Sequence, residues 1–355
     1  MSTNDDPPAY PENPQNFDGY EKIGVCIPNP IEMNNLPEIE FKKQENIEEA
    51  PSISEDQARD ALRNFVKESI FYKKEPVETM RVISMTPFNT SKYTLDTFVE
   101  TRSTNYKSEP FFGVPNMMLN MMNGRPPQPW EINARPSSLF VDSIFKTEIP
   151  NSSHLEICRM CNAQGFKPCF HCKGSGRKPC FSCNGMRFKT GIDSKQEPCF
   201  SCKGNGFDSC FQCKGSGRDP CFHCKGAGRL KWYLELCVEF KTHKDEYFKH
   251  SDHVTEKNLK KCIGKSVFTE TNHKLNPITN YSDSAINQAS NSLINQHLSK
   301  YSSSKILAQR HEINVIPVTL VTYEYNGKQY NYIVYGLENK VNTDEYPAKG
   351  CCTII

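Results

Sequence analysis

Six C-x-x-C pairs between residues 158 and 224 constrain the fold of this 355-residue chain more than any other feature. Their first cysteines are 11, 11, 19, 11 and 11 residues apart, so the pattern is symmetric about its middle. Two intervening residues let the chain turn tightly enough for both sulfurs to reach one zinc ion, at about 2.3 Å each. Because two such turns complete a tetrahedral site, six turns predict up to three structural zinc ions. The pairs are Cys158/Cys161, Cys169/Cys172, Cys180/Cys183, Cys199/Cys202, Cys210/Cys213 and Cys221/Cys224.

Two ways of combining the turns are open. In a nested hairpin the outer pairs meet, then the middle pairs and then the inner pairs, and symmetric spacing keeps two antiparallel arms in step. If neighbouring turns pair instead, Cys158 through Cys172 form one site and Cys210 through Cys224 form another. Both schemes share the central site. The symmetric spacing favours nesting, with the sites Cys158/Cys161/Cys221/Cys224, Cys169/Cys172/Cys210/Cys213 and Cys180/Cys183/Cys199/Cys202.

Glycines follow the cysteine turns. Four turns fit C-x-x-C-x-G-x-G, in which glycine permits positive φ angles and a close approach of the backbone to the thiolates. The turns CRMCNAQG and CFSCNGMR depart from this repeat. We therefore expect distorted or weaker sites at these two turns.

Phenylalanine follows the first cysteine in five turns. In one interpretation the rings cover the zinc-thiolate turns and one another as a minimal core. In the other, a row of aromatic rings binds apolar segments of partner proteins or stacks on bases. His171 and His223 lie inside two turns, and we expect them to face solvent because both neighbouring cysteines already serve as ligands. The five aromatic residues are Phe170, Phe181, Phe200, Phe211 and Phe222.

The chain begins MSTNDDPPAY, without the basic and apolar regions of a leader, and no apolar run approaches the roughly 18 residues of a membrane span. We therefore expect a cytoplasmic, or also nuclear, protein. In a reducing compartment its 17 cysteines would bind metal or stay free. Cys26, Cys237 and Cys262 are isolated, and we expect them to be ordinary thiols.

The rest of the chain predicts an α+β fold, an antiparallel sheet body with helices that is interrupted by a long zinc-stabilised β-hairpin arm. Ser54 and Gln57 form a capping-box pattern before a helix of about five turns that extends toward Pro76. A second helix is expected over 283–300, with Ser282 as its cap. Strands are expected over 78–85, 91–101 and 230–241, and in a hairpin around Asn326 and Gly327.

The two ends differ from the body in composition. Residues 1–51 hold eight prolines and a net charge of −8, which predicts a disordered acidic arm. Cys352-Thr353-Ile354-Ile355 fits a prenylation pattern, and Cys351 is a candidate for acylation, which would attach the chain peripherally to a membrane. The predicted parts are a disordered arm over 1–51, two halves of the body over 52–150 and 231–347, the zinc arm over 151–230 and a lipidated tail over 348–355.

These motifs resemble a known domain. Four C-x-x-C-x-G-x-G repeats are similar to the cysteine-rich zinc domain of DnaJ-type chaperones, but the chain has six pairs rather than four and no His-Pro-Asp tripeptide, so a J-domain is missing. The flanking segments resemble the Ssu-two homolog family over roughly residues 60–352. They are FVETRS, PWEINARPSSLF, TNYSDSAINQASNSLINQH, PVTLVTYEYNGKQYNYIVYG and DEYPAKGCC. The resemblance implies a chaperone-like role, with unfolded proteins or an Hsp-type chaperone as partners.

Charge and motifs limit the classes of function. Residues 158–230 contain thirteen Lys or Arg and four Asp or Glu, for a net charge of +9 that three zinc ions on twelve thiolates would reduce to +3. Nucleic acid is therefore not the favoured partner, since affinity for phosphates grows with the number of neutralised charges. No phosphate-binding loop or nucleophile elbow appears, so we predict no enzyme. The alternatives are thiol-disulfide exchange by one C-x-x-C pair and RNA binding by the arm. The oligomeric state is not indicated.

Overall fold

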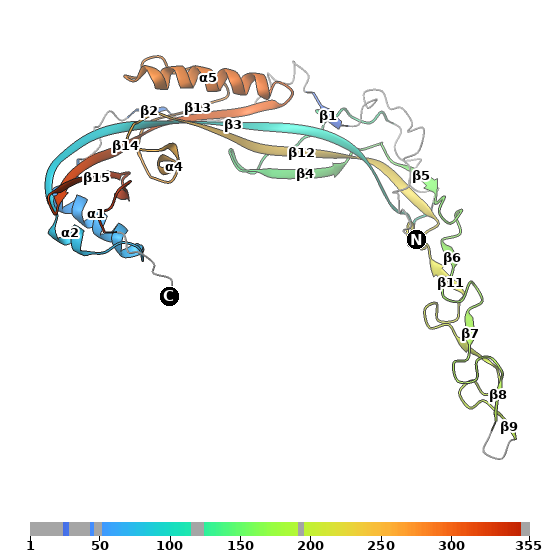
Figure 1. The fold of residues 1–355 in the computed structure, drawn as a ribbon. Coiled ribbons are helices and arrows are strands. Elements are labelled where there is room, and N and C mark those ends of the chain that lie inside the picture. Colours follow the sequence, from blue (N-terminus) through green and yellow to red (C-terminus); the bar gives the residue numbers. More distant parts are fainter. Residues whose placement is uncertain (1–23, 28–42, 46–51, 115–123, 191–194, 349–355) are drawn as a thin grey trace. The chain divides into compact units, whose positions relative to one another are not determined.

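The computed structural model describes residues 24–27, 43–45, 52–114, 124–190 and 195–348. Antiparallel β-sheet makes up most of the regular structure in these residues, and helices are few (Figure 1). The expected antiparallel sheet with helices is therefore confirmed at this level. The helices are α1 (Glu55–Glu68), α2 (Glu75–Thr79), α4 (Glu256–Leu259) and α5 (Ser284–Lys300). None of these helices is both long enough and apolar enough to span a bilayer.

Ten strands form the large sheet. Its main path runs in the order β16, β15, β14, β3, β12 and β4, while β1 pairs with β3, β5 with β12, and β13 with both β14 and β2. The strands are β1 (Gly24–Cys26), β2 (Lys43–Glu45), β3 (Arg81–Pro110), β4 (Ser143–Glu148), β5 (His154–Ile157), β12 (Arg229–Phe248), β13 (Lys265–Asn272), β14 (Lys305–Tyr325), β15 (Lys328–Tyr335) and β16 (Lys340–Asn342).

Six short strands lie between β5 and β12 and form three two-stranded sheets of their own. They are β6 (Phe166–Pro168), β7 (Arg177–Pro179), β8 (Phe188–Thr190), β9 (Gln196–Pro198), β10 (Phe207–Ser209) and β11 (Arg218–Pro220).

The described residues divide into two compact units. The cysteine unit takes its described residues from 1–26, 102–133 and 145–237, and the helix unit takes its residues from 27–101, 134–144 and 238–355. The long strands β3 and β12 contribute residues to both units. Each unit is described by itself below.

In the helix unit, strand β3 joins two segments that the sequence predicts as separate strands. It pairs with β14 without a register shift from Phe98↔Ala308 to Ser84↔Thr322. Pro87 lies within this stretch, opposite Thr319. Proline lacks an N–H group, but a strand continues where the remaining backbone groups keep their partners. The prediction of two strands is therefore wrong, because a partner strand of 21 residues holds the whole segment extended.

Helix α1 begins as the sequence predicts and ends earlier. Gln57 donates its backbone N–H to Ser54 Oγ at 3.3 Å, and the Ser54 N–H donates to Gln57 Oε1 at 2.9 Å, so the capping box is confirmed. The helix ends at Glu68, well before Pro76, and Ile70 beyond it is exposed. The predicted helical face therefore stops at Val66.

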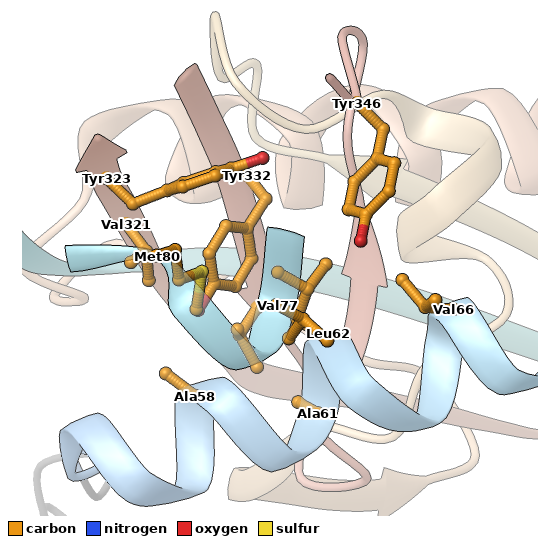
Figure 2. Packing of buried hydrophobic residues seen from close by; sticks show 11 residues of the cluster. Ala58, Ala61, Leu62, Val66, Val77, Met80, Val321, Tyr323, Tyr332 and Tyr346 are labelled. Atoms are coloured by element: carbon orange, nitrogen blue, oxygen red, sulfur yellow. The ribbon is translucent and has the colours of Figure 1, made fainter. Parts of the chain in front are cut away.

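One face of α1 is buried against the sheet (Figure 2). Ala58, Leu62 and Val66 are spaced four residues apart, as expected for an apolar stripe on a helix. Figure 2 shows them facing Tyr332 of β15 and Val77 of α2. This cluster contains no cysteine, so no metal ligand takes part in its packing.

Helix α5 covers another part of β14 and β13. Its N-cap is Asp283, whose Oδ1 accepts the backbone N–H of Ala285 at 3.0 Å, so the predicted cap Ser282 is wrong by one residue. Carboxylate oxygens accept hydrogen bonds at least as well as hydroxyls do at this position. The buried residues of the helix meet Tyr93 and Ile313 in a second cluster.

The predicted hairpin is confirmed. Strands β14 and β15 join through Asn326 and Gly327, whose φ angles are 53° and 73°, and Tyr325 pairs with Lys328. Two positive φ angles define the turn type that matches the twist of paired strands.

Two short segments near the N-terminus form strands. Residues 24–26 pair with Arg102–Thr104 of β3 in the cysteine unit, and residues 43–45 pair with β13 in the helix unit. Both strands lie within residues 1–51, which the sequence predicts to be disordered. They form because β3 and β13, which are distant in the sequence, supply their backbone hydrogen bonds. The remainder of this segment lies outside the described residues.

Candidate metal centres

The twelve cysteines of the array form three groups of four. We call them the outer group (Cys158, Cys161, Cys221 and Cys224), the middle group (Cys169, Cys172, Cys210 and Cys213) and the tip group (Cys180, Cys183, Cys199 and Cys202). Within each group all sulfurs lie within 4.8 Å of one another, and every cysteine is buried. These are the groups of the nested scheme, and the sequential scheme is not observed.

The spacing of the sulfurs fits a tetrahedral metal ion. Four ligands at about 2.3 Å from zinc would lie about 3.8 Å from one another. The measured Sγ–Sγ distances are 3.9 Å for Cys158–Cys221 and 3.7 Å for Cys161–Cys224, and the middle and tip groups each contain a distance of 3.7 Å. A disulfide would require about 2.0 Å, and the twelve cysteines of the three groups form none. The three groups therefore fit metal ions, and four soft thiolates are typical of zinc.

Nested strand pairs bring the turns together. Strand β6 pairs with β11, β7 with β10 and β8 with β9, each in antiparallel register over three residues. Figure 1 shows these pairs following one another along a single segment, which we call the cysteine arm (residues 158–228). Each pair is too short to be stable alone, since an isolated hairpin is marginal in water.

Reciprocal backbone hydrogen bonds join the two turns of each group. In the outer group, the N–H of Cys158 donates to the carbonyl of Gly228 at 2.9 Å, and the N–H of Cys221 donates to the carbonyl of Gly165 at 2.8 Å. The middle and tip groups repeat this arrangement. The two turns of a group are thus related by an approximate two-fold axis, which explains why the sequence spacing is symmetric.

The two glycines of the C-x-x-C-x-G-x-G repeat have different roles. The second glycine is the one whose carbonyl accepts the N–H of the facing cysteine. A Cβ atom at Gly217 would lie only 2.3 Å from the carbonyl oxygen of Gly174, whereas a Cβ atom at Gly226 would meet no atom within 4 Å. The second glycine is therefore required by space in the outer and middle groups, whereas a Cβ atom at a first glycine would come no closer than 3.8 Å to any backbone atom. Ala163 stands at a first-glycine position, with φ of 65°, and the turn keeps its geometry. The expected distortion of the CRMCNAQG turn is not observed.

Backbone N–H groups donate to the sulfur of the second cysteine in five turns. The donors are the second glycines, at 3.2 to 3.3 Å: Gly165 to Cys161, Gly176 to Cys172, Gly206 to Cys202, Gly217 to Cys213 and Gly228 to Cys224. Such bonds stabilise the negative charge of a thiolate and orient it toward a metal.

The sixth turn departs from this pattern, as the sequence led us to expect. Arg187 occupies the second-glycine position, and its φ angle is 70°. Its carbonyl still accepts the N–H of Cys199 at 2.8 Å. We did not single out Arg187 from the sequence, although the missing glycine in CFSCNGMR was the signal that identifies it.

The thiols differ in acidity. Burial raises the pKa of Cys158 to about 12. A hydrogen bond from the backbone N–H of Cys202 is the main cause that lowers the pKa of Cys199 to about 7. Burial would raise the pKa of Cys221, but backbone N–H groups, led by that of Cys224, outweigh it and the pKa falls to about 7. The pKa of Cys213 in the middle group is likewise lowered to about 7 by backbone N–H groups that outweigh its burial. Each group therefore contains one thiol with a lowered pKa, which assists the capture of a metal ion.

The five phenylalanine rings of the array are almost completely exposed. Phe170 is 87% exposed, and the exposed fractions of Phe181, Phe200, Phe211 and Phe222 are 95% or 96%. The interpretation that these rings cover the metal turns as a minimal core is therefore wrong. The cysteine sulfurs are shielded by the glycine-rich backbone instead, so the rings are left on the surface.

The remaining candidate residues lie outside the groups. His171 is exposed and His223 is half-buried, and neither belongs to a four-cysteine group. Cys26, Cys237 and Cys262 belong to none of the three four-cysteine groups. Cys351 and Cys352 lie outside the described residues, so their proposed lipidation stays a prediction.

Comparison with known proteins supports the sequence resemblance. The Danio rerio protein named Protein SSUH2 homolog is 38% identical over 344 residues, which cover 95% of this chain and 93% of that protein. A Homo sapiens protein of the same name is 34% identical over 304 residues, or 85% of this chain and 80% of that protein. No family model matches the chain, and no solved structure matches it.

Fold and site together define an antiparallel-sheet protein that carries three buried four-cysteine groups fit for metal ions. The chain belongs to the SSUH2 homolog family, which confirms the resemblance to the Ssu-two homologs.

Proposed function

We propose that this protein is a non-enzymatic zinc protein whose cysteine arm binds other proteins, in a chaperone-like role. The observation that carries the proposal is the set of five exposed phenylalanine rings on a segment whose middle and tip clusters, among the described residues, consist of cysteines alone. Zinc, when bound, would supply the cross-links that hold the arm in shape. Exposed aromatic side chains on a rigid support are typical anchors for protein partners.

The free-energy cost of exposing the rings supports their proposed role. Burial of a phenylalanine side chain stabilises a folded protein by roughly 2 kcal/mol, and an exposed ring does not make this contribution. Their repetition in five of six turns at equivalent positions supports a shared role in binding apolar segments. Unfolded proteins offer such segments, and the mildly basic arm would favour acidic ones.

A thiol-disulfide enzyme is less well supported by the geometry. Exchange requires an accessible thiolate, whereas all twelve cysteines of the three groups are buried. Metal-bound thiolates would be shielded further. We therefore propose a structural role for the cysteines and place the function on the outer surface of the arm.

Two measurements test the proposal. Metal analysis of the reduced, purified protein should approach three zinc ions per chain, and a protein without zinc would refute the structural role. Suppression of the aggregation of an unfolded client should then be lost in a variant with all five phenylalanines changed to alanine. Because the rings are exposed, this variant should keep its zinc and its melting temperature.

A matched control removes exposed apolar side chains elsewhere. Ile70, Phe71 and Ile263 are exposed residues of the helix unit, and their triple alanine variant should suppress aggregation as the wild type does. Equal activity of the five-phenylalanine variant and the wild type would contradict the proposed role of the rings. Binding of single-stranded RNA by the wild type but not by the five-phenylalanine variant would instead favour the alternative of an RNA-binding arm.

A further inference from the structure

The tip group differs from the other two groups in the hydrogen bonds that its sulfurs accept. In the outer and middle groups, both second cysteines accept a backbone N–H from a glycine. In the tip group, Cys202 accepts such a bond from Gly206 at 3.2 Å. Among the described residues, Arg187 donates no corresponding bond to the sulfur of Cys183.

The side chain of Arg187 accounts for the missing hydrogen bond to the sulfur of Cys183. A Cβ atom at a second-glycine position collides with the carbonyl of the facing turn, as it would at Gly165, Gly176, Gly217 and Gly228, where the distance would be 2.3 Å. The facing turns of the tip group are more widely separated. At Gly206 the corresponding distance, to the carbonyl of Gly185, would be 2.9 Å. This separation makes room for Arg187, and its backbone N–H no longer reaches the sulfur.

The tip group also has the least support from other residues. The outer group packs with Leu230, Ala227 and Trp232. The clusters around the middle and tip groups each consist of four cysteines alone. Strands β8 and β9 at the tip are exposed throughout, whereas β10 and β11 beside the middle group each contain a half-buried residue. Local opening of the tip would therefore expose little apolar surface beyond the sulfurs, and regions with few buried contacts open at low free energy.

We infer that the tip group is the metal site that the cysteine arm releases first, and that Arg187 is the residue that makes it so. The inference rests on the proposed function only in taking the three groups as zinc sites. Four thiolates leave a bound zinc ion with a net charge of −2, which N–H donors stabilise, and loss of one such partner typically weakens metal binding about tenfold or more. Release at the tip would free the turns that carry Phe181 and Phe200, while the outer and middle groups still hold the base of the arm.

The experiment uses the full-length, zinc-loaded protein and a chromophoric chelator. We expect one equivalent of zinc to leave in a first phase, separate from the remaining two. Alkylation by iodoacetamide after that phase, followed by peptide mass mapping, should label Cys180, Cys183, Cys199 and Cys202 before the other eight ligands. Release of all three ions in one phase, or first labelling of the outer or middle group, would overturn the inference.

Two variants separate the causes. Arg187→Gly restores the glycine that a φ of 70° favours and permits the missing N–H bond, so release from the tip should slow about tenfold. Arg187→Ala removes the same positive charge but keeps the Cβ atom, so release should be unchanged or faster. Equal effects of the two variants would show that charge, not backbone geometry, decides. A purified protein that binds no zinc would instead refute the proposed function itself.

Discussion

The sulfurs of Cys161 and Cys224 lie 3.7 Å apart although 63 residues separate them in the chain. This contact closes the cysteine arm at its base, and the middle and tip groups close it further along. Within the arm, buried cysteines take the place of a conventional hydrophobic core. Metal ions bound at the three groups would therefore stabilise the cysteine arm directly, whereas the clusters that pack on α1 and α5 contain none of these twelve cysteines.

Removal of metal should unfold the arm and leave the helix unit folded. Structural zinc contributes on the order of 10 kcal/mol in small cysteine-rich peptides, and the arm has little other core. After treatment with a chelator and a reductant, trypsin should cut at the lysines and arginines between residues 159 and 229 at much lower concentration than in the zinc-loaded protein. Fragments from residues 238–348 should persist, because their clusters contain no cysteine ligand. Digestion of the cysteine arm and of residues 238–348 at equal rates would contradict this prediction.

A second glycine and a first glycine of the C-x-x-C-x-G-x-G repeat should respond differently to alanine. Gly217→Ala places a Cβ atom 2.3 Å from the carbonyl of Gly174, so the turns of the middle group must separate. We expect the variant to bind two zinc ions rather than three. Gly226→Ala meets no atom within 4 Å, and its positive φ should cost only about 1 kcal/mol. This control should keep all three ions, and loss of one there would show that φ rather than space is decisive.

Two buried tyrosine hydroxyls should be dispensable for stability. Tyr323 and Tyr332 lie in the cluster that packs against α1 (Figure 2), and their hydroxyl oxygens have no hydrogen-bond partner among the described residues. A buried polar group without a partner costs roughly 1 to 3 kcal/mol. Tyr323→Phe and Tyr332→Phe should therefore raise the melting temperature or leave it unchanged. Tyr346→Phe is the control, because its hydroxyl donates to the carbonyl of Lys73 at 2.7 Å and its loss should lower stability by about 1 kcal/mol.

The same tyrosines predict a dependence on high pH. Burial raises the pKa of Tyr323 and of Tyr332 above the ordinary value of about 10. Above pH 10 the unfolded chain therefore loses protons that the folded chain keeps, and the free energy of unfolding falls as the pH rises. The decline should be shallower in the double phenylalanine variant. Equal slopes for the variant and the wild type would mean that these hydroxyls are not buried in solution.

His297 should be essential for the attachment of α5 to the sheet. Its imidazole is completely buried, with Nε2 2.7 Å from Asp245 Oδ2 and Nδ1 2.7 Å from Thr97 Oγ1. His297→Ala leaves a cavity and removes a partner from the buried hydroxyl of Thr97, so we expect a loss of about 2 to 3 kcal/mol in urea denaturation. His250→Ala, at an almost fully exposed side chain, should have no measurable effect.

The predicted lipidation of the tail can be tested apart from the fold. If Cys352 is prenylated, wild-type protein expressed in eukaryotic cells should partition with membranes, and Cys352→Ser should move it to the soluble fraction. Because one prenyl chain binds membranes only weakly, Cys351→Ser should produce an intermediate distribution if that residue carries a second lipid. Identical membrane fractionation of the wild type and of Cys352→Ser would contradict the predicted prenylation.

Much of the candidate site could be predicted because its chemistry is local. A C-x-x-C turn brings two sulfurs to one point by its own length, and equal spacing in both arms permits only a few pairings. The capping box of α1 and the turn at Asn326 and Gly327 are equally local, since each depends on the conformational preferences of a few neighbouring residues. Sequence alone therefore identified the twelve cysteines of the three groups, favoured their nested grouping and identified several element boundaries.

Only the tertiary structure decided the features that depend on distant partners. Strand β14 holds β3 extended past Pro87, which the local pattern does not reveal. Phe181 and Phe200 are exposed because no described segment of the chain packs on their rings, and a sequence cannot show that a neighbour is missing. Ala163 and Arg187 both replace a glycine, but at different positions of the repeat. A Cβ atom at the first position meets no atom within 4 Å at Gly226, whereas one at the second position meets a carbonyl group across the arm at Gly217. That difference lies in the distance between two chain segments, and a linear pattern of glycines contains no such distance.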